Sequence, residues 1–154
     1  MLKKLILGII ASACICSVSV AKTSENNYFK VDLTDAWTEQ AMNSQQGADV
    51  SMYINTKDGS YVTIAIVENG MDAKTAGEQT MTNMKNSGFK VEPMQQKDGY
   101  YEATFANDQV KGVYYFCDNG KQFSAINVIG SELDQGKEFI KTVQPKDPKL
   151  FPKL

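Results

Sequence analysis

The sequence predicts an α+β fold, in which two helices pack on an antiparallel sheet of about six to seven strands. Short segments with alternating apolar residues follow one another along the chain, and turns rich in Asp, Asn and Gly separate them. Two longer segments change to three- and four-residue spacing, which is typical of amphipathic helices. Because short turns join the neighbouring strands, we expect the sheet to be antiparallel.

Three predicted strands precede the first helix. Residues 28–33 and 50–54 each alternate apolar and polar side chains. Residues 57–60 (Lys-Asp-Gly-Ser) have turn chemistry, and residues 61–67 form the second strand of this hairpin. Residues 62–67 are apolar on both faces, which is typical of a central strand that is covered on both sides of its sheet.

The first helix is predicted over residues 72–87, because small residues and methionines recur on one side and Gly88 follows as a stop. The last helix begins at residues 131–134 (Ser-Glu-Leu-Asp), which resemble a capping box. Four strands are predicted between the two helices, at residues 89–95, 100–106, 111–117 and 122–129. The predicted element order is therefore β-β-β-α-β-β-β-β-α.

Residues 1–21 have the pattern of a secretory signal peptide. Lys3 and Lys4 precede an uncharged run of 16 residues, and the segment ends in Ser-Val-Ala at Ala21. A membrane-spanning helix needs about 20 apolar residues, so the run is short for a permanent span. We expect cleavage after Ala21 and a periplasmic or secreted protein without a stable membrane span.

Two alternatives for this segment stay open. Cys14 follows small residues, as in a lipoprotein signal, although the residues after it remain apolar. An uncleaved segment would instead act as an N-terminal anchor. With cleavage, we expect a flexible leader at residues 22–27, a single domain at residues 28–144 and a proline-rich C-terminal tail at residues 145–154.

The composition excludes several function classes. The chain of 154 residues has no histidine, and its 16 basic residues are all lysines. The absence of histidine excludes His-based catalytic triads, haem ligation by His and most catalytic zinc sites. Cleavage after Ala21 leaves 14 lysines against 18 acidic residues, a net charge of −4. A mildly acidic protein without arginine is a poor match for nucleic acid, so we expect no nucleic-acid partner.

Four short segments, together with the element order, resemble the PsbP-like and DcrB-like superfamily, to which the Ran-binding Mog proteins also belong. They are Leu-Thr-Asp-Ala-Trp at residues 33–37, Ser-Tyr-Val-Thr-Ile at 60–64, Ala-Gly-Glu at 76–78 and Gly-Tyr-Tyr-Glu-Ala at 99–103. Ala36 stands where the family pattern has glycine. The resemblance covers residues 28–145 and implies an αβα sandwich around an antiparallel sheet. It also implies a non-catalytic protein that binds other proteins, and no metal site carries over, because the family's metal sites depend on histidine.

Aromatic residues are the candidate contacts for such a partner. Tyr100, Tyr101, Tyr114 and Tyr115 lie in pairs on predicted strands, so each pair serves both faces of the sheet. Trp37, the only tryptophan, follows the first strand. These rings either pack in the core or line an uncovered part of the sheet as a docking surface. The leading hypothesis is therefore an exported binding or accessory protein of the cell envelope.

No residue pattern predicts catalysis or a cofactor. Cys117 ends a strand and is either a buried core residue or a free reactive thiol. Aspartates at the predicted turns lack the alternating oxygen ligands of a calcium loop; they are Asp58, Asp98, Asp108 and Asp118. Glu78, Glu92 and Glu102 are the acidic residues from which paired-carboxylate hydrolysis could be imagined, but nothing in the sequence places two of them across a cleft.

A small-molecule or lipid carrier is the alternative function. An apolar pocket between helix and sheet would use Met81, Met84 and Phe139 as a deformable lining. The identity of the partner or ligand and the oligomeric state do not follow from the residues.

Overall fold

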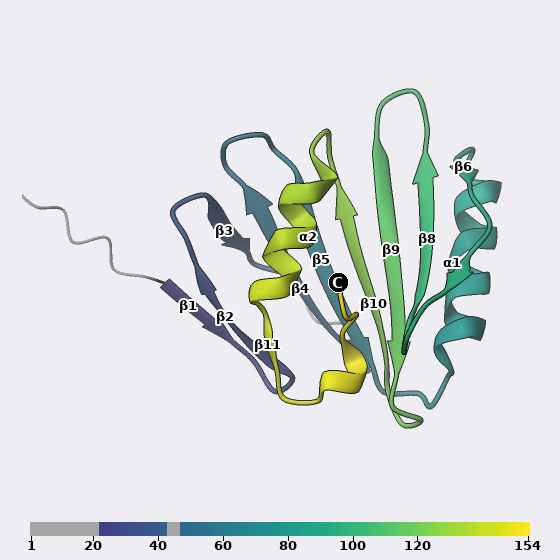
Figure 1. The fold of residues 1–154 in the computed structure, drawn as a ribbon, viewed down its shortest axis with the longest axis horizontal. Coiled ribbons are helices and arrows are strands. Elements are labelled where there is room, and N and C mark those ends of the chain that lie inside the picture. The colour runs from purple at the N-terminus through teal and green to yellow at the C-terminus, as the bar shows by residue number, and fades with distance from the viewer. Residues whose placement is uncertain (1–21, 43–46) are drawn as a thin grey trace, which may run out of the picture.

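Two antiparallel sheets and two α-helices make up the computed structural model, which describes residues 22–42 and 47–154 (Figure 1). The expected cleavage after Ala21 and the alternative at Cys14 lie outside these residues. The large sheet has eight strands, which are β3 (Trp37–Gln40), β4 (Ala48–Asn55), β5 (Tyr61–Val67), β10 (Phe123–Ile129), β9 (Lys111–Asp118), β8 (Tyr101–Ala106) and β6 (Lys90–Val91) in spatial order, with β7 (Gln95–Gln96) also paired to β8. The small sheet has the order β1 (Lys22–Glu25), β2 (Phe29–Leu33) and β11 (Gln144–Pro145).

The large sheet is built from hairpins whose turns follow the predicted chemistry. Asp58 Oδ1 accepts a hydrogen bond from the Ser60 N–H at 2.8 Å, and Gly59 has a φ of 73° in the β4–β5 turn. Gly120 has a φ of 84° in the β9–β10 turn. Glycine adopts this left-handed conformation without the steric cost that other residues incur. The predicted hairpins at these turns are therefore confirmed.

Helix α2 (Leu133–Thr142) covers one face of the large sheet, in front of β5 and β10 in Figure 1. Gly136 allows the close approach, because a Cβ at this position would collide with Cγ1 of Val128 and lie 3.1 Å from its Cγ2. Further along the helix, the Phe139 ring lies 5.0 Å from the ring of Tyr53. We call this side of the sheet the α2 face.

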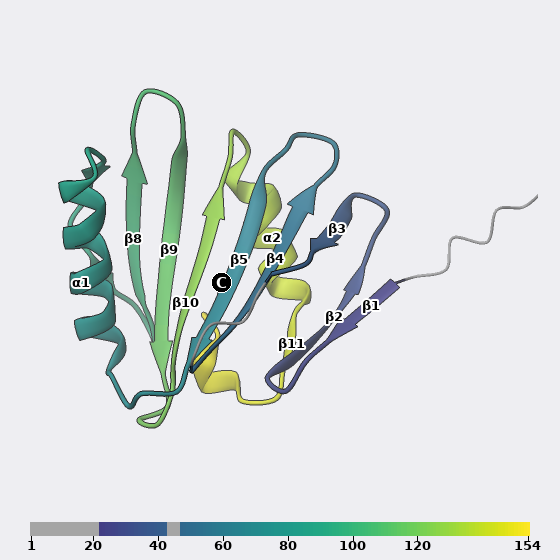
Figure 2. The same ribbon diagram turned by 180° about the vertical axis from the view of Figure 1, so that it is seen from behind.

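Helix α1 (Ala73–Asn86) packs on the opposite face, where it contacts β8, β9 and β10. In Figure 2 it lies beside β8, at the left of the view. Its N-cap is Asp72, whose side chain accepts a hydrogen bond from the Thr75 N–H at 2.9 Å, and its C-cap Ser87 is followed by Gly88 at a φ of 89°. Gly77 lies over Phe116, since a Cβ there would be 3.0 Å from Cδ2 of that ring. The predicted extent and end of this helix are confirmed, and we call its side of the sheet the α1 face.

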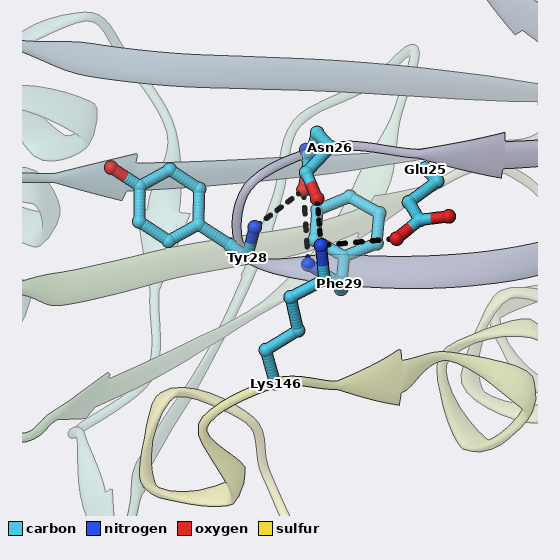
Figure 3. A network of polar contacts seen from close by, with 5 residues as sticks. All are labelled: Glu25, Asn26, Tyr28, Phe29 and Lys146. Atoms are coloured by element: carbon cyan, nitrogen blue, oxygen red, sulfur yellow. Dashed lines mark hydrogen bonds and ion pairs between the residues drawn. The ribbon is translucent and has the colours of Figure 1, made fainter.

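The small sheet is tied to the chain end by a polar network around the β1–β2 turn (Figure 3). Asn26 Oδ1 accepts hydrogen bonds from the backbone N–H groups of Tyr28 and Phe29, at 2.9 and 3.0 Å. Lys146 Nζ donates to the Asn26 carbonyl at 2.7 Å and pairs with Glu25 at 3.0 Å. These contacts join residues that are 120 positions apart.

Residues 22–27 and 145–154 are more ordered than the sequence predicts. Residues 22–27, expected as a flexible leader, contain β1, which pairs with β2. Residues 145–154, expected as an extended tail, contain the end of β11 and the 3₁₀ helix η1 (Pro148–Leu150). Leu150 and Phe151 are buried, and the Phe151 ring lies 5.7 Å from that of Phe29. Burial of apolar side chains holds the last residues in place.

Three other details differ from the prediction. The large sheet has eight strands rather than six or seven, partly because Trp37 begins β3. The strand predicted at residues 89–95 is split into β6 and β7, and Pro93 between them cannot donate to a ladder. The capping box at Ser131 is absent, because the N-cap of α2 is Glu132, without a side-chain hydrogen bond.

The substitution Gly136→Ala tests the close packing of α2. Alanine normally favours a helix by about 1 kcal/mol over glycine. Here we expect the free energy of unfolding to fall by about 1–3 kcal/mol, because the new methyl group collides with Val128 in the core. Urea denaturation measures the change, with Gln135→Ala at the neighbouring exposed position as control. A stability equal to or above the wild type contradicts the packing.

Candidate binding surface

The paired aromatic residues are divided between the two faces of the sheet, as the strand period predicts. Tyr115 lies on the α2 face, is 0% exposed, and has a hydroxyl without a hydrogen-bond partner among the described residues. Tyr100 packs against it with the ring centroids 5.9 Å apart. Burial is the main reason why the pKa of the Tyr115 hydroxyl is raised. Tyr115 is therefore a core residue and presents no surface to a partner.

Trp37 is also part of the core. Its side chain is 8% exposed and lies on the α2 face, where its ring centroid is 4.4 Å from that of Phe139. The ring therefore closes one end of the core beneath α2 and contributes hydrophobic burial to stability. Of the two interpretations of Trp37, the structural one fits this position.

Tyr101 and Tyr114 lie on the α1 face and are half-buried. Tyr114 stacks on Phe116, with centroids 5.3 Å apart and planes 9° apart. Tyr61 on β5 is a further aromatic residue of this face, and burial, with Tyr114 nearby, raises the pKa of its hydroxyl. Tyr61 and Tyr114 thus lie together at the boundary between the strands below α1 and the strands beyond it.

Strands β4, β5 and β10 form an open, uncharged surface beside α1. The register of β4, β5 and β10 brings twelve half-buried side chains to the α1 face in four rows of three. We call these twelve residues the open face. In order along β4, its rows are Ala48 with Val67 and Phe123, Val50 with Ala65 and Ala125, Met52 with Thr63 and Asn127, and Ile54 with Tyr61 and Ile129. Ten of the twelve are apolar or aromatic, and none carries a charge.

Helix α1 leaves most of the open face uncovered. It packs on β6, β8, β9 and β10, and Ala125 is the residue of the open face that joins the cluster below the helix. Figure 2 shows the sheet from this side, with no helix in front of β5 or β4. On the other face of the sheet, α2 packs on β5 and β10. The double-sided apolar pattern of residues 62–67 predicts cover on both sides, and within the described residues a helix covers one side only.

A groove runs along the other flank of α1, between this helix and the segment that joins β6 to β7. It has a volume of about 620 Å³. Met81, Met94 and Tyr101 contribute its apolar surface, and Lys74 and Lys85 line it from the helix. The pocket predicted from Met81, Met84 and Phe139 therefore forms only in part. Phe139 packs on the α2 face, whereas both methionines lie on the α1 face.

Three of the four turn aspartates bond to nearby polar groups or pair with lysine. Asp58 bonds to Ser60, which lowers the pKa of its carboxyl group, and Asp118 Oδ2 accepts from the Ala73 N–H at the start of α1. Asp98 pairs with Lys153 at 3.1 Å. Within residues 22–42 and 47–154, no group of three or more Cys, Asp or Glu side chains is placed to hold a metal ion. The same part of the chain has no helix that is both long and apolar enough to cross a bilayer.

Two of the three glutamates considered for hydrolysis line the same groove, and the third does not. Glu78 and Glu92 line the groove beside α1. Glu102 faces the other way, because it pairs in register with Tyr115 of the α2 face. The structure therefore places Glu78 and Glu92 at one groove, which the sequence does not predict, and Glu102 on the other face of the sheet.

The open face contains residues that the sequence does not single out. Met52, Tyr61 and Phe123 lie on three different strands and meet only through the pairing of β4, β5 and β10. One signal pointed to the central strand of this face, namely the apolar character of both faces of residues 62–67. Neither the comparison with protein-family models nor the comparison with curated proteins finds a match for this chain.

The labelling rate of the Cys117 thiol tests whether the core on the α2 face excludes solvent. Its side chain is 0% exposed, and burial raises the pKa of the thiol to about 12. Since the thiolate is the reactive form, we expect almost no labelling of native protein at pH 8 and rapid labelling in urea. Peptide mass spectrometry assigns the label, with the exposed variant Lys121→Cys as positive control. Native labelling of Cys117 at a rate near that of this control contradicts a buried thiol.

Proposed function

We propose that this protein is an exported, non-catalytic binding module of the cell envelope, which recognises another protein through the open face. The observation that carries the proposal is the uncharged surface on β4, β5 and β10, to which the register brings twelve side chains. Large apolar patches on a soluble protein typically mark interaction sites. Depletion of charge with retention of aromatic residues is the composition typical of an interface core.

The fold proposed for this module is the αβα sandwich of the PsbP-like and DcrB-like superfamily. The position of α1 and α2 on opposite faces of the large sheet supports it. The additional small sheet, with β1 and β11 at its edges, goes beyond the pattern that the resemblance implies.

Export through a signal segment that is cleaved after Ala21 is part of the proposal. The basic start, the apolar run and the small residues at its end support it. The described residues of β1, Lys22–Glu25, all follow the proposed cleavage site, so a chain cut after Ala21 would keep them.

The substitution Ala65→Lys tests the binding surface. Ala65 lies between Val50 and Ala125 in the open face, so a lysine there puts a charge at the centre of the contact. We expect recovery of the partner from crosslinked envelope fractions to fall about tenfold or more. The long side chain can extend into solvent, so the fold should persist, which circular dichroism and urea denaturation check.

The matched control is Gln135→Lys, which adds the same charge at an exposed position of α2 on the opposite face. It should leave recovery unchanged. If Ala65→Lys recovers its partners as well as the wild type does, the open face is not the binding surface. Recovery of no partner by the wild type under any growth condition overturns the proposed function.

A small-molecule or lipid carrier is the second candidate, and the groove beside α1 favours it. Its volume of about 620 Å³ is in the range of ligand sites, and Met81 and Met94 provide adaptable apolar contacts. Native mass spectrometry of freshly purified protein should then show a bound molecule of a few hundred daltons. Thr82→Trp, which places a bulky ring at the groove, should lose it.

The control for the carrier hypothesis is Gln79→Trp, on an exposed part of α1 outside that groove. This variant should keep the bound molecule. A wild-type spectrum that contains only the bare protein argues against the carrier.

A further inference from the structure

The width of the open face matches one α-helix. Three strands at a spacing of about 4.8 Å place β4 and β10 about 10 Å apart, which is close to the diameter of a helix with its side chains. The seven paired residues from Ala48 to Ile54 extend for about 20 Å, the length of a helix of about 14 residues. On the other side of these strands, α2 already occupies such a position above β5 and β10.

The area of the open face argues against a second copy of this chain as the occupant. With a width of about 10 Å and a length of about 20 Å, the open face covers on the order of 200 Å², whereas a stable protein pair buries about 800 Å² on each partner. Two such faces pressed together leave most of each interface unfilled. A helix beside α1 has a second wall to contact, so its contact area exceeds the open face itself.

The flank of α1 that borders the open face is also uncharged. Lys74, Glu78 and Lys85 line the groove on the far flank of this helix. At 100° per residue, Ala76, Thr80 and Asn83 then lie on the flank toward β10 and β5. Ala76 is itself buried, so the uncharged polar residues Thr80 and Asn83 are the side chains on this flank that a second helix would contact.

We propose that the open face binds one amphipathic helix of the partner protein, which lies beside α1 and covers β5. The inference rests on the proposed function, since it names the structural element that the partner presents. Because the open face carries no charge, the contacting stripe of that helix is apolar and uncharged, with residues at i, i+3, i+4 and i+7. Its charged residues point to solvent.

Photo-crosslinking in the full chain identifies the occupant. Benzoylphenylalanine is introduced at Met52, on the far strand of the open face, at Asn83, on the near flank of α1, and at Thr82, on the groove side, as control. After irradiation of envelope fractions, we expect Met52 and Asn83 to give crosslinks to the same partner segment of about 14 residues, with Thr82 giving none to it. A crosslink to a second copy of this chain, or to lipid alone, overturns the inference.

A synthetic peptide of the mapped segment then tests the helix. We expect its helical circular dichroism to rise on binding, and its affinity for Ala65→Lys to be at least tenfold weaker than for the wild type. A proline at the centre of the peptide should abolish binding, because it interrupts the helix. Affinity should change little between low and high salt.

The outcomes separate this inference from the proposed function. A mapped segment that binds in an extended form, or that tolerates the proline, overturns the helix but retains recognition of a protein by the open face. Crosslinks from none of the positions, together with recovery that Ala65→Lys does not change, overturn both.

Discussion

The pairing of β5 between β4 and β10 is the constraint on which the rest of the structure depends. Both ladders are antiparallel and run for seven residues, so they determine which side chains of three strands share a face. Because successive residues alternate, a shift of one position would exchange the two sets completely. The register observed sends Val62, Ile64 and Ile66 to the core under α2 and leaves Tyr61, Ala65 and Val67 on the other side.

The core on the α2 face is closed by the small sheet and by the last residues of the chain. The small sheet meets the large one through buried and exposed polar contacts as well as apolar ones. Ser24 lies 2.9 Å from the Tyr53 hydroxyl, and Tyr28 donates to Glu68 at 2.7 Å. This last bond raises the pKa of Tyr28 to about 12 and lowers that of Glu68, because it favours the neutral phenol and the charged carboxylate. A complete enclosure on this side explains why Trp37 and Tyr115 are structural.

The two faces of the same strands therefore have different roles. On the α2 face, a helix, the small sheet and the last residues exclude water from large apolar side chains. On the α1 face, one helix lies over β8, β9 and β10, and the side chains of β4 and β5 are only half-buried. Burial of the apolar side chains on the α2 face stabilises the fold. The open face on the other side of the same strands is the surface that the proposed function uses.

Local features of this protein follow from the sequence alone. The extent of α1, from its Asp72 cap to Gly88, and the hairpin turns at Gly59 and Gly120 were predicted correctly. Their signals are side-chain periods of two to four residues and turn residues whose backbone preferences act within a few positions. The division of the tyrosine pairs between two faces follows from the same strand period.

Only the tertiary structure decided which of those faces is covered. The burial of Trp37 by Phe139, the separation of Phe139 from Met81, and the order of the last residues around Phe151 all depend on contacts between distant parts of the chain. The open face also depends on such contacts, because its rows combine residues from β4, β5 and β10. A sequence states which side chains are apolar, but whether water reaches them depends on what packs above them.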